Sequence, residues 1–130
     1  MSAEKTKLVR LRIANAKKTL NEIDVLVENE FWNTTVNRLY YACFYAVTAL
    51  LLNYDLDSKT HGGVQRLFGL HFIKTGKINE KHGEFYSTLF QMRQDADYEA
   101  EVEYEKDDVI KLIGPAHELV SGIEAYLLKG

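Results

Sequence analysis

The feature that most constrains the fold of this chain is a run of 16 residues without a formal charge, from Leu39 to Tyr54. It lies in a predicted helix over residues 32–53. A transmembrane helix needs about 20 apolar residues, and this run is shorter and carries four tyrosines. We therefore expect a buried helix and no membrane span. A helix that is apolar on all sides has to be covered on all sides.

Two arrangements would cover such a helix: it lies at the centre of a bundle, or another subunit packs against one of its faces. Each helix of a four-helix bundle keeps an outer face. The sequence therefore predicts a homodimer, with residues 32–53 contributing to the interface.

Apolar residues at helical spacing predict four further helices, over residues 4–28, 61–74, 81–98 and 107–128. Thr60 is a candidate N-cap, and Pro115 predicts a kink or a break in the last helix. Residues 99–105 alternate like a strand but are so acidic that we expect an extended surface loop. The fold class is all-α, an up-and-down helical bundle of four to five helices.

Composition predicts one globular domain over residues 1–130, because 46% of the residues are hydrophobic and 27% are charged. The charged N-terminus has no apolar signal core, and a single cysteine, Cys43, excludes an internal disulfide. Both observations favour a cytoplasmic location. The formal net charge of −3 argues against tight, nonspecific binding to nucleic acid.

Charge is unevenly distributed along the chain. Residues 1–20 hold six Lys and Arg against one Glu, whereas residues 99–108 hold six Asp and Glu against one Lys. These two segments could attract each other, within one chain or between two. They could equally be two solvated faces, since surface ion pairs are weak.

The metal-binding residue types lack the spacing that a metal site needs. His61, His71, His82 and His117 form no His-x-x-x-His or Glu-x-x-His pair. No serine or cysteine lies in a nucleophile motif, and there is no glycine-rich phosphate loop. We therefore expect neither a metal nor a cofactor.

Two polar clusters interrupt the helices. Asn37 and Arg38 stand beside Tyr40 and Tyr41, and the stretch Arg93-Gln94-Asp95-Ala96-Asp97-Tyr98 ends the helix over residues 81–98. Such side chains are costly to bury unless they are paired. One interpretation is a structural network that fixes the register of the helices. The other is an anion site, because arginine binds phosphate bidentately and tyrosines offer stacking faces.

Three ordered blocks of this sequence resemble the HEPN domain (higher eukaryotes and prokaryotes nucleotide-binding). Residues 37–46 read Asn-Arg-Leu-Tyr-Tyr-Ala-Cys-Phe-Tyr-Ala, similar to the family's Asn-Arg-x-Tyr-Tyr-Ala-x-Phe signature. Residues 60–63, Thr-His-Gly-Gly, followed by Phe68 and by residues 71–76, resemble its second block, and residues 93–98 resemble its third. The similarity is to the small stand-alone branch of the family.

The resemblance implies an all-α bundle that dimerises. It also implies that active members are metal-independent ribonucleases, in which an arginine and a histidine face the dimer cleft. Many members are encoded beside a small nucleotidyltransferase as a toxin–antitoxin pair. Here Tyr98 stands where the motif has histidine, with four residues between it and Arg93. A tyrosine has an ordinary pKa of about 10 and is a poor base near neutral pH.

By their positions in the resembling motif, the candidate catalytic residues are Arg93 and Tyr98. A literal Arg-x4-His at Arg66 and His71 lies in the wrong block, and five residues on a helix turn the two side chains about 140° apart. The candidate ligand-binding residues are Asn37, Arg38, Tyr41, His61 and Asp95.

The sequence supports one leading function and two alternatives. The leading one is a dimer that binds a nucleotide, RNA or a nucleotidyltransferase partner, with Arg93 as the anion contact, in one half of a toxin–antitoxin pair. The first alternative is a metal-independent ribonuclease that uses Arg93 and Tyr98, with His61 as a possible third group. The second is a pure dimerisation scaffold. The binding function and the ribonuclease depend on whether Arg93 reaches an open groove between helices.

Overall fold

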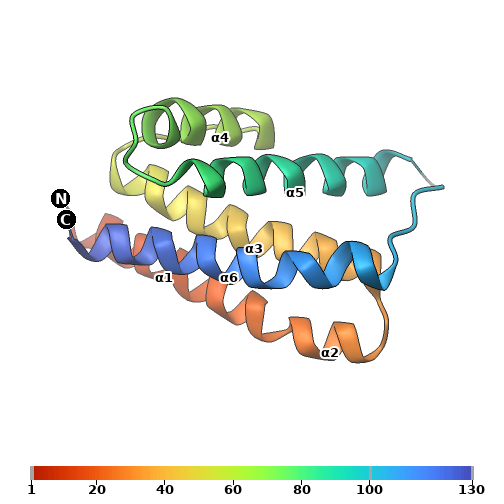
Figure 1. The fold of residues 1–130 in the computed structure, drawn as a ribbon. Helices are drawn as coiled ribbons and strands as arrows, with labels where there is room; N and C mark the ends of the chain where they lie inside the picture. The colour runs from red at the N-terminus through yellow and green to blue at the C-terminus, as the bar shows by residue number, and fades with distance from the viewer. Residues whose placement is uncertain (1, 100, 130) are drawn as a thin grey trace.

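The computed structural model of the chain describes residues 2–99 and 101–129, and over these residues it is all-helical with no strand. Four long helices alternate in direction and bring the two ends of the chain to the same end of the bundle (Figure 1). This arrangement confirms the predicted up-and-down helical bundle. The elements are α1 (Ala3–Asn21), α2 (Ile23–Glu28), α3 (Trp32–Asn53), α4 (His61–Phe68), the π-helical segment η1 (Gly69–Ile73), α5 (Glu80–Tyr98) and α6 (Lys106–Lys129).

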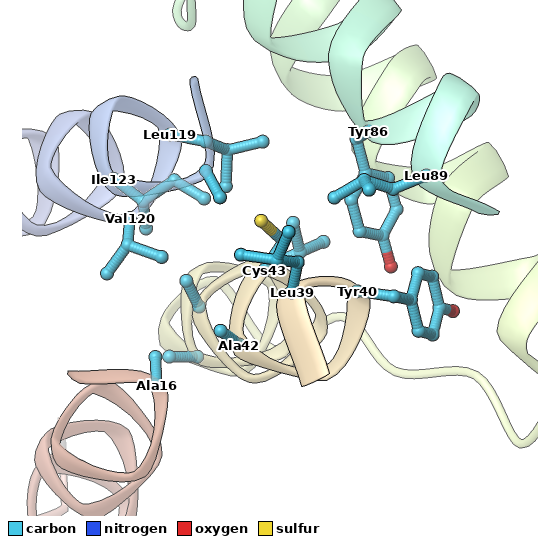
Figure 2. Packing of buried hydrophobic residues seen from close by; sticks show 14 of the residues in the cluster. Ala16, Leu39, Tyr40, Ala42, Cys43, Tyr86, Leu89, Leu119, Val120 and Ile123 are labelled. Carbon is cyan, nitrogen blue, oxygen red and sulfur yellow. The ribbon is translucent and has the colours of Figure 1, made fainter. Parts of the chain in front are cut away.

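The charge-free helix α3 lies at the centre of the bundle. It packs against α1, α5 and α6, and more lightly against α2 and α4. Figure 2 shows Leu39 and Cys43 of α3 facing apolar side chains of α5 and α6, while Ala42 meets Ala16 of α1. Among all residues of α3, only Thr34 is exposed. One subunit therefore supplies most of the cover that the sequence requires, and the homodimer stays a prediction.

One stripe of α3 is less covered than the rest. Its residues are half-buried and recur at helical spacing, so they share one face of the helix. This stripe carries the polar and aromatic residues of the first sequence cluster. Its members are Asn37, Arg38, Tyr41, Phe44, Tyr45 and Thr48.

The single helix predicted over residues 4–28 was wrong in one respect, because it is divided at Glu22 into α1 and α2. The Thr19 hydroxyl donates to the Asn15 carbonyl at 2.8 Å, and the Glu22 amide donates to the Thr19 carbonyl at 3.1 Å. A threonine that bonds back to its own helix tends to bend it. Apolar spacing alone does not report this local competition for carbonyl groups.

The segment predicted as a helix over residues 61–74 begins as expected and ends differently. The Thr60 hydroxyl accepts a hydrogen bond from the Gly63 amide at 2.9 Å, which confirms the predicted N-cap. A side chain at Gly63 would collide with Ser58, so this position requires glycine. From Gly69 the backbone widens into the π-helical segment η1, where the Lys74 amide donates to the Gly69 carbonyl at 2.8 Å.

The last helix continues through Pro115, so the break considered for this position does not occur. Proline leaves the carbonyl four residues earlier without its helical donor. That carbonyl belongs to Lys111, an exposed residue, and water can take the place of the missing donor. No Cβ atom at the neighbouring Gly114 would meet a described atom within 4 Å.

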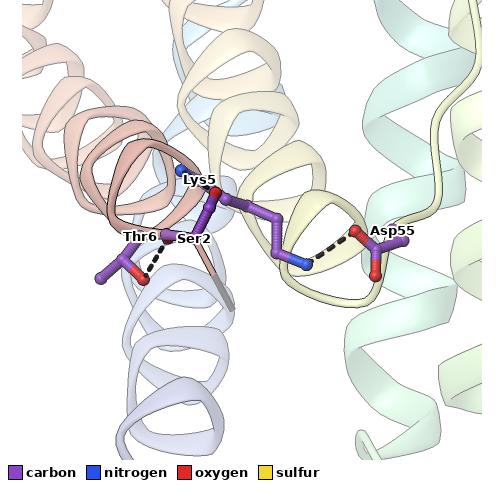
Figure 3. A network of polar contacts seen from close by, with 4 residues as sticks. All are labelled: Ser2, Lys5, Thr6 and Asp55. Atoms are coloured by element: carbon purple, nitrogen blue, oxygen red, sulfur yellow. Dashed lines mark hydrogen bonds and ion pairs between the residues drawn. The ribbon is translucent and has the colours of Figure 1, made fainter.

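A polar contact ties the start of α1 to the loop after α3 (Figure 3). Lys5 Nζ lies 2.6 Å from Asp55 Oδ1, and the Ser2 hydroxyl caps α1 by accepting from the Lys5 amide at 3.1 Å. Another cation of α1, Lys17, pairs with Glu124 of α6 at 2.6 Å. These α1 cations therefore pair with acids outside the acidic segment, which lies at the opposite end of the bundle from the start of α1.

The acidic residues expected to form a surface loop connect α5 to α6 without regular secondary structure over the described part, 99 and 101–105. In the part of the chain that the structure describes, no helix has the length and apolar character needed to cross a membrane.

Removal of a core side chain from α3 is predicted to cost far more stability than removal of an exposed one. Leu39 is fully buried, and Leu39→Ala should lower the free energy of unfolding by about 2–5 kcal/mol, from lost burial and the cavity left behind. Leu128 on α6 is 82% exposed, so Leu128→Ala should change stability by less than about 0.5 kcal/mol. Urea unfolding followed by circular dichroism measures both values, and equal losses would contradict the central placement of α3.

Candidate functional site

The two polar clusters found in the sequence meet around the ring of Tyr41 on the less covered stripe of α3. The guanidinium carbon of Arg38 lies 5.7 Å from the centre of this ring, and that of Arg93 on α5 lies 5.6 Å from it. Arg93 also lies 5.4 Å from the centre of the Tyr40 ring. All three distances are within the range of cation–π attraction. Helices α3 and α5 thus bring together two arginines that are 55 positions apart in the sequence.

Arg93 is mostly buried, with 16% of its side chain exposed, but its donors are not all used. Its Nε lies 3.0 Å from Asp97 Oδ2, as the four-residue spacing predicted, yet at an angle that makes no directed hydrogen bond. Its Nη2 donates to the Tyr41 hydroxyl at a long 3.4 Å. A guanidinium offers five N–H donors. Arg93 therefore retains hydrogen-bonding capacity for a further oxygen ligand.

A cavity of about 310 Å³ opens beside Arg93, between the first turns of α3 and the last turns of α5. Arg93 and Asn37 stand in its wall, which places these two predicted site residues at one hollow. It is lined by Asn33, Thr34, Val36, Asn37, Arg93, Ala96 and Asp97.

The loop between α5 and α6 holds one edge of this cavity in place. Asn33 donates to the Val102 carbonyl at 2.9 Å and accepts from the Tyr104 amide at 2.8 Å. The Tyr104 hydroxyl donates to the Met92 carbonyl of α5 at 2.8 Å. These three hydrogen bonds join the start of α3, the acidic loop and the end of α5.

His61 enters the same cluster from the first turn of α4. Its ring stacks on Phe44 with centres 4.5 Å apart and meets the edge of Tyr41 at 5.8 Å. Its Nδ1 lies 2.7 Å from the Tyr40 hydroxyl oxygen. Burial lowers the pKa of His61, and the positive charge of Arg93 lowers it further. A neutral imidazole therefore lies close to the cationic group of α5.

Behind His61 the cluster continues into the core through two tyrosines. Tyr40 and Tyr86 are both fully buried and stack with ring centres 5.8 Å apart. Burial raises the pKa of Tyr40 to about 12, although the neighbouring Tyr86 hydroxyl and the charge of Arg93 oppose the rise. Burial likewise raises the pKa of Tyr86 well above its usual range. Both phenols are neutral near pH 7.

The structure does not bring two of the predicted site residues into this cluster within one subunit. Tyr98 is 79% exposed at the end of α5 and, five residues after Arg93, is turned about 140° away from it around the helix. Asp95 accepts a hydrogen bond from Gln91 at 2.9 Å, and its charge adds to burial in raising the pKa of Tyr104. The acid beside Arg93 is Asp97.

Arg66 and His71, the literal Arg-x4-His of the sequence, lie outside the cluster, on α4 and η1. Among the described residues, no three His, Cys, Asp or Glu side chains gather closely enough to coordinate a metal ion.

The list of site residues taken from the sequence missed several members of the cluster, which are Asn33, Tyr40, Phe44, Tyr86 and Asp97. One signal was available: Tyr86 precedes Arg93 by two helical turns and therefore shares its face of α5. Phe44 similarly follows Tyr40 by four residues on α3. No periodicity within one helix predicts that His61, on the separate helix α4, would lie against these faces of α3 and α5.

The fold and this cluster define an all-α up-and-down bundle with an arginine- and tyrosine-rich site between α3, α4 and α5. A sequence model of the HEPN domain matches residues 9–126, which is most of the chain. The chain therefore belongs to the HEPN-domain family, as its three sequence blocks indicated.

Relatives cover nearly the full length of the chain. A Thermotoga maritima protein named "UPF0332 protein" is 39% identical over 95% of this chain and 94% of its own length. A Methanocaldococcus jannaschii protein named "Putative toxin" is 35% identical over 89% of this chain and 79% of its own. An Archaeoglobus fulgidus "UPF0332 protein" is 32% identical over 83% and 86%. These names support a toxin-like branch of the family.

The two histidines with lowered pKa values predict that acid destabilises the fold. Burial lowers the pKa of His61 and of His82, and nearby cations, Arg93 and Lys81 respectively, lower each further. The unfolded chain then binds more protons than the folded one below the ordinary histidine pKa of about 6.5. Stability is fully present above that pH and is lost as the pH falls through the lower folded-state values.

Urea unfolding at pH 7.5, 6.5, 5.5 and 5.0 measures this loss. His61→Gln and His82→Gln should each flatten the dependence of stability on pH in this range. The control His117→Gln, at an exposed position of α6, should leave it unchanged. A wild-type stability that rises as the pH falls from 7 to 5 would contradict the inferred burial of neutral imidazoles.

Proposed function

We propose that this protein binds a phosphate-bearing ligand, a nucleotide or RNA, through Arg93, and that it acts as a homodimer in one half of a toxin–antitoxin pair. One observation carries the binding proposal: a mostly buried guanidinium with unused donors stands at the wall of a cavity. Burying a cation is costly unless it is paired, and Asp97 alone leaves most of the donors of Arg93 unmatched.

The surroundings of Arg93 suit an oxygen anion attached to a flat base. A phosphate can accept two parallel hydrogen bonds from a guanidinium. The Arg38 guanidinium lies against the ring of Tyr41, as that of Arg93 does. Its ion pair with Glu22 is long, at 3.9 Å, so the charge of Arg38 is available to the same ligand. Asn37 adds an amide at the cavity wall. The half-buried ring of Tyr45, 6.1 Å from that of Tyr41, extends the aromatic surface on which a base can stack.

The dimer is proposed to complete this site. The resemblance to HEPN domains implies a cleft between two subunits, and Tyr98 at the end of α5 is exposed by 79% in one subunit. In a dimer built over the stripe of α3 that carries Tyr41, a second subunit would cover the remaining open faces of this cluster. Tyr98 would then face the shared cleft rather than bulk water.

The biological role is proposed from the relatives and the family. Two Methanocaldococcus jannaschii relatives carry toxin names, and one of them is 37% identical over 69% of this chain. The resemblance to HEPN domains implies that many members are encoded beside a small nucleotidyltransferase, which we propose as the partner of this chain. We place the protein in the cytoplasm, the compartment that holds both RNA and nucleotides.

A metal-independent ribonuclease is the second candidate function, favoured by the imidazole of His61 close to Arg93. General acid–base catalysis on a ribose hydroxyl needs a group that titrates near neutral pH. Histidine meets this requirement better than Tyr98. A pure dimerisation scaffold has less support, because it gives no use to the unmatched donors of Arg93.

Loss of the guanidinium is predicted to weaken ligand binding strongly while the fold and the dimer persist. We expect Arg93→Gln to weaken binding of adenosine 5′-monophosphate, or of a short single-stranded RNA, by about 10- to 100-fold, since a hydrogen bond to a charged group contributes about 1.5–3 kcal/mol. The matched control is Arg66→Gln, at an exposed arginine of α4 outside the cluster. Calorimetric titration measures affinity, and light scattering measures mass.

Equal affinities for the wild type and Arg93→Gln would contradict the binding proposal. Unfolding of Arg93→Gln would favour the structural network instead. The same preparations, incubated with RNA in the presence of a chelator, test the ribonuclease. Cleavage that is present in the wild type and lost in Arg93→Gln would support it, whereas cleavage that survives in Arg93→Gln comes from another site or a contaminant.

A further inference from the structure

An acid stands in the wall of the cavity that holds the proposed anion site. Asp97 lines this cavity together with Arg93, and its side chain is 39% exposed. Its Oδ2 lies 3.0 Å from Arg93 Nε, but no hydrogen bond to this carboxylate is present among residues 2–99 and 101–129. A carboxylate repels a phosphate that binds beside it. Binding of an anion alone therefore leaves the position of Asp97 unexplained.

The polar groups of the cavity wall match a ligand that brings both acceptors and a donor. A guanidinium only donates and an ionised carboxylate only accepts, whereas an amide does both. The side chain of Asn33 is already bonded to the backbone of the loop after α5. Arg93, Asn37 and Asp97 remain to bind a ligand. Such a ligand presents acceptors to Arg93 and at least one donor to Asp97.

The short distance between these two groups indicates which donor of a nucleotide fits. Because Arg93 Nε and Asp97 Oδ2 are 3.0 Å apart, the ligand atoms that bind to them are also near neighbours. A phosphodiester is negatively charged and has no proton to donate. In a ribonucleotide, the 2′-hydroxyl is on the carbon next to the one that carries the 3′-phosphate, and it can donate. The donors of the bases lie farther from that phosphate, and DNA has no donor at the 2′ position.

The size of the cavity suits one nucleotide unit of a single strand. Its volume is about 310 Å³, near the lower end of the range of small-molecule pockets, which is about 300–1,000 Å³. The buried Val36 and the methyl group of Ala96 form the apolar part of its wall. The wall therefore combines polar groups for a phosphate and a hydroxyl with apolar contact for a sugar ring. A double helix is too wide for this cavity.

We propose that Asp97 is a specificity-determining residue, which accepts a hydrogen bond from the 2′-hydroxyl of a ribonucleotide whose 3′-phosphate is bound by Arg93. This role of Asp97 rests on the proposed function of Arg93 and adds the substrate class to it. The site takes a ribonucleotide unit, free or within single-stranded RNA, in preference to DNA. The hydroxyl gives the carboxylate a donor where a deoxyribonucleotide would leave it unpaired beside a phosphate.

Calorimetric titration of the wild-type chain with matched nucleotides at pH 7.5 tests this role. Adenosine 3′-monophosphate should bind about tenfold more tightly than 2′-deoxyadenosine 3′-monophosphate, because it makes one more hydrogen bond to a charged group. The 2′-fluoro analogue, which cannot donate at this position, should bind like the deoxy compound. A chelator is present throughout, so that no divalent metal ion bridges Asp97 and the phosphate.

A pair of matched variants separates this role from simple neutralisation of Arg93. In Asp97→Asn the ratio of the two affinities should fall toward one, and the deoxy compound should bind at least as tightly as it does to the wild type, because the repulsion of its phosphate is removed. The control is Asp95→Asn, on the same helix. Its carboxylate accepts from Gln91 and does not line the cavity, so the ratio should stay at the wild-type value.

Two results would disprove the role of Asp97 and leave the anion site in place, provided that Arg93→Gln still weakens the binding of both compounds. One is equal affinity of the wild type for the ribose and deoxyribose compounds, and the other is a preference for ribose that persists in Asp97→Asn. Unchanged binding of both compounds in Arg93→Gln, or no binding of either to the wild type, would disprove the anion site and the role of Asp97 with it. The wild-type comparison is decisive even if a variant fails to fold.

Discussion

The contact on which the site depends is that of the Arg93 guanidinium with the rings of Tyr40 and Tyr41, 5.4 and 5.6 Å from their centres. It joins α5 to the central helix α3 at a point where neither helix supplies hydrogen-bond acceptors for all the N–H donors of Arg93. The aromatic faces stabilise the charge without using its N–H donors. An arginine held mainly by ring faces and by one carboxylate can accept a new oxygen ligand at little cost in existing hydrogen bonds.

This contact also organises the neighbouring groups. Because Tyr41 touches Arg38, Arg93 and His61, a shift of its ring would move all three groups relative to one another. Behind it, the fully buried Tyr40 and Tyr86 continue the cluster into the core, where neutral phenols are retained by burial. The site is therefore built mainly on the helices α3, α4 and α5, and the loop after α5 closes one edge of its cavity. A site of this kind suits binding that depends on orientation.

The sequence predicted the fold well because its strongest signals are properties of whole helices. The charge-free run of α3 indicated a buried helix, and the cap at Thr60 was confirmed. The errors lie where local hydrogen bonding overrides periodicity. Thr19 competes for a helix carbonyl just before the break at Glu22, and a solvated carbonyl lets α6 continue through Pro115.

The site was only partly predictable, for a different reason. The spacing of Arg93 and Asp97 on one helix predicted their ion pair, and that of Arg38 and Tyr41 predicted a shared face. The approach of His61 to Tyr40 depends on how α4 packs against α3, which no spacing within one helix encodes. For Tyr98, the family motif identified the position, but its proposed place in a shared cleft would depend on a second subunit.

The most direct test of the central claim is a crystal structure of the protein with adenosine 5′-monophosphate. The account predicts phosphate oxygens within hydrogen-bonding distance of the Arg93 guanidinium, inside the cavity between α3 and α5, with the Tyr40 and Tyr41 rings still against that group. A nucleotide bound elsewhere, with Arg93 paired only to Asp97 and Tyr41 as in the free protein, would contradict it.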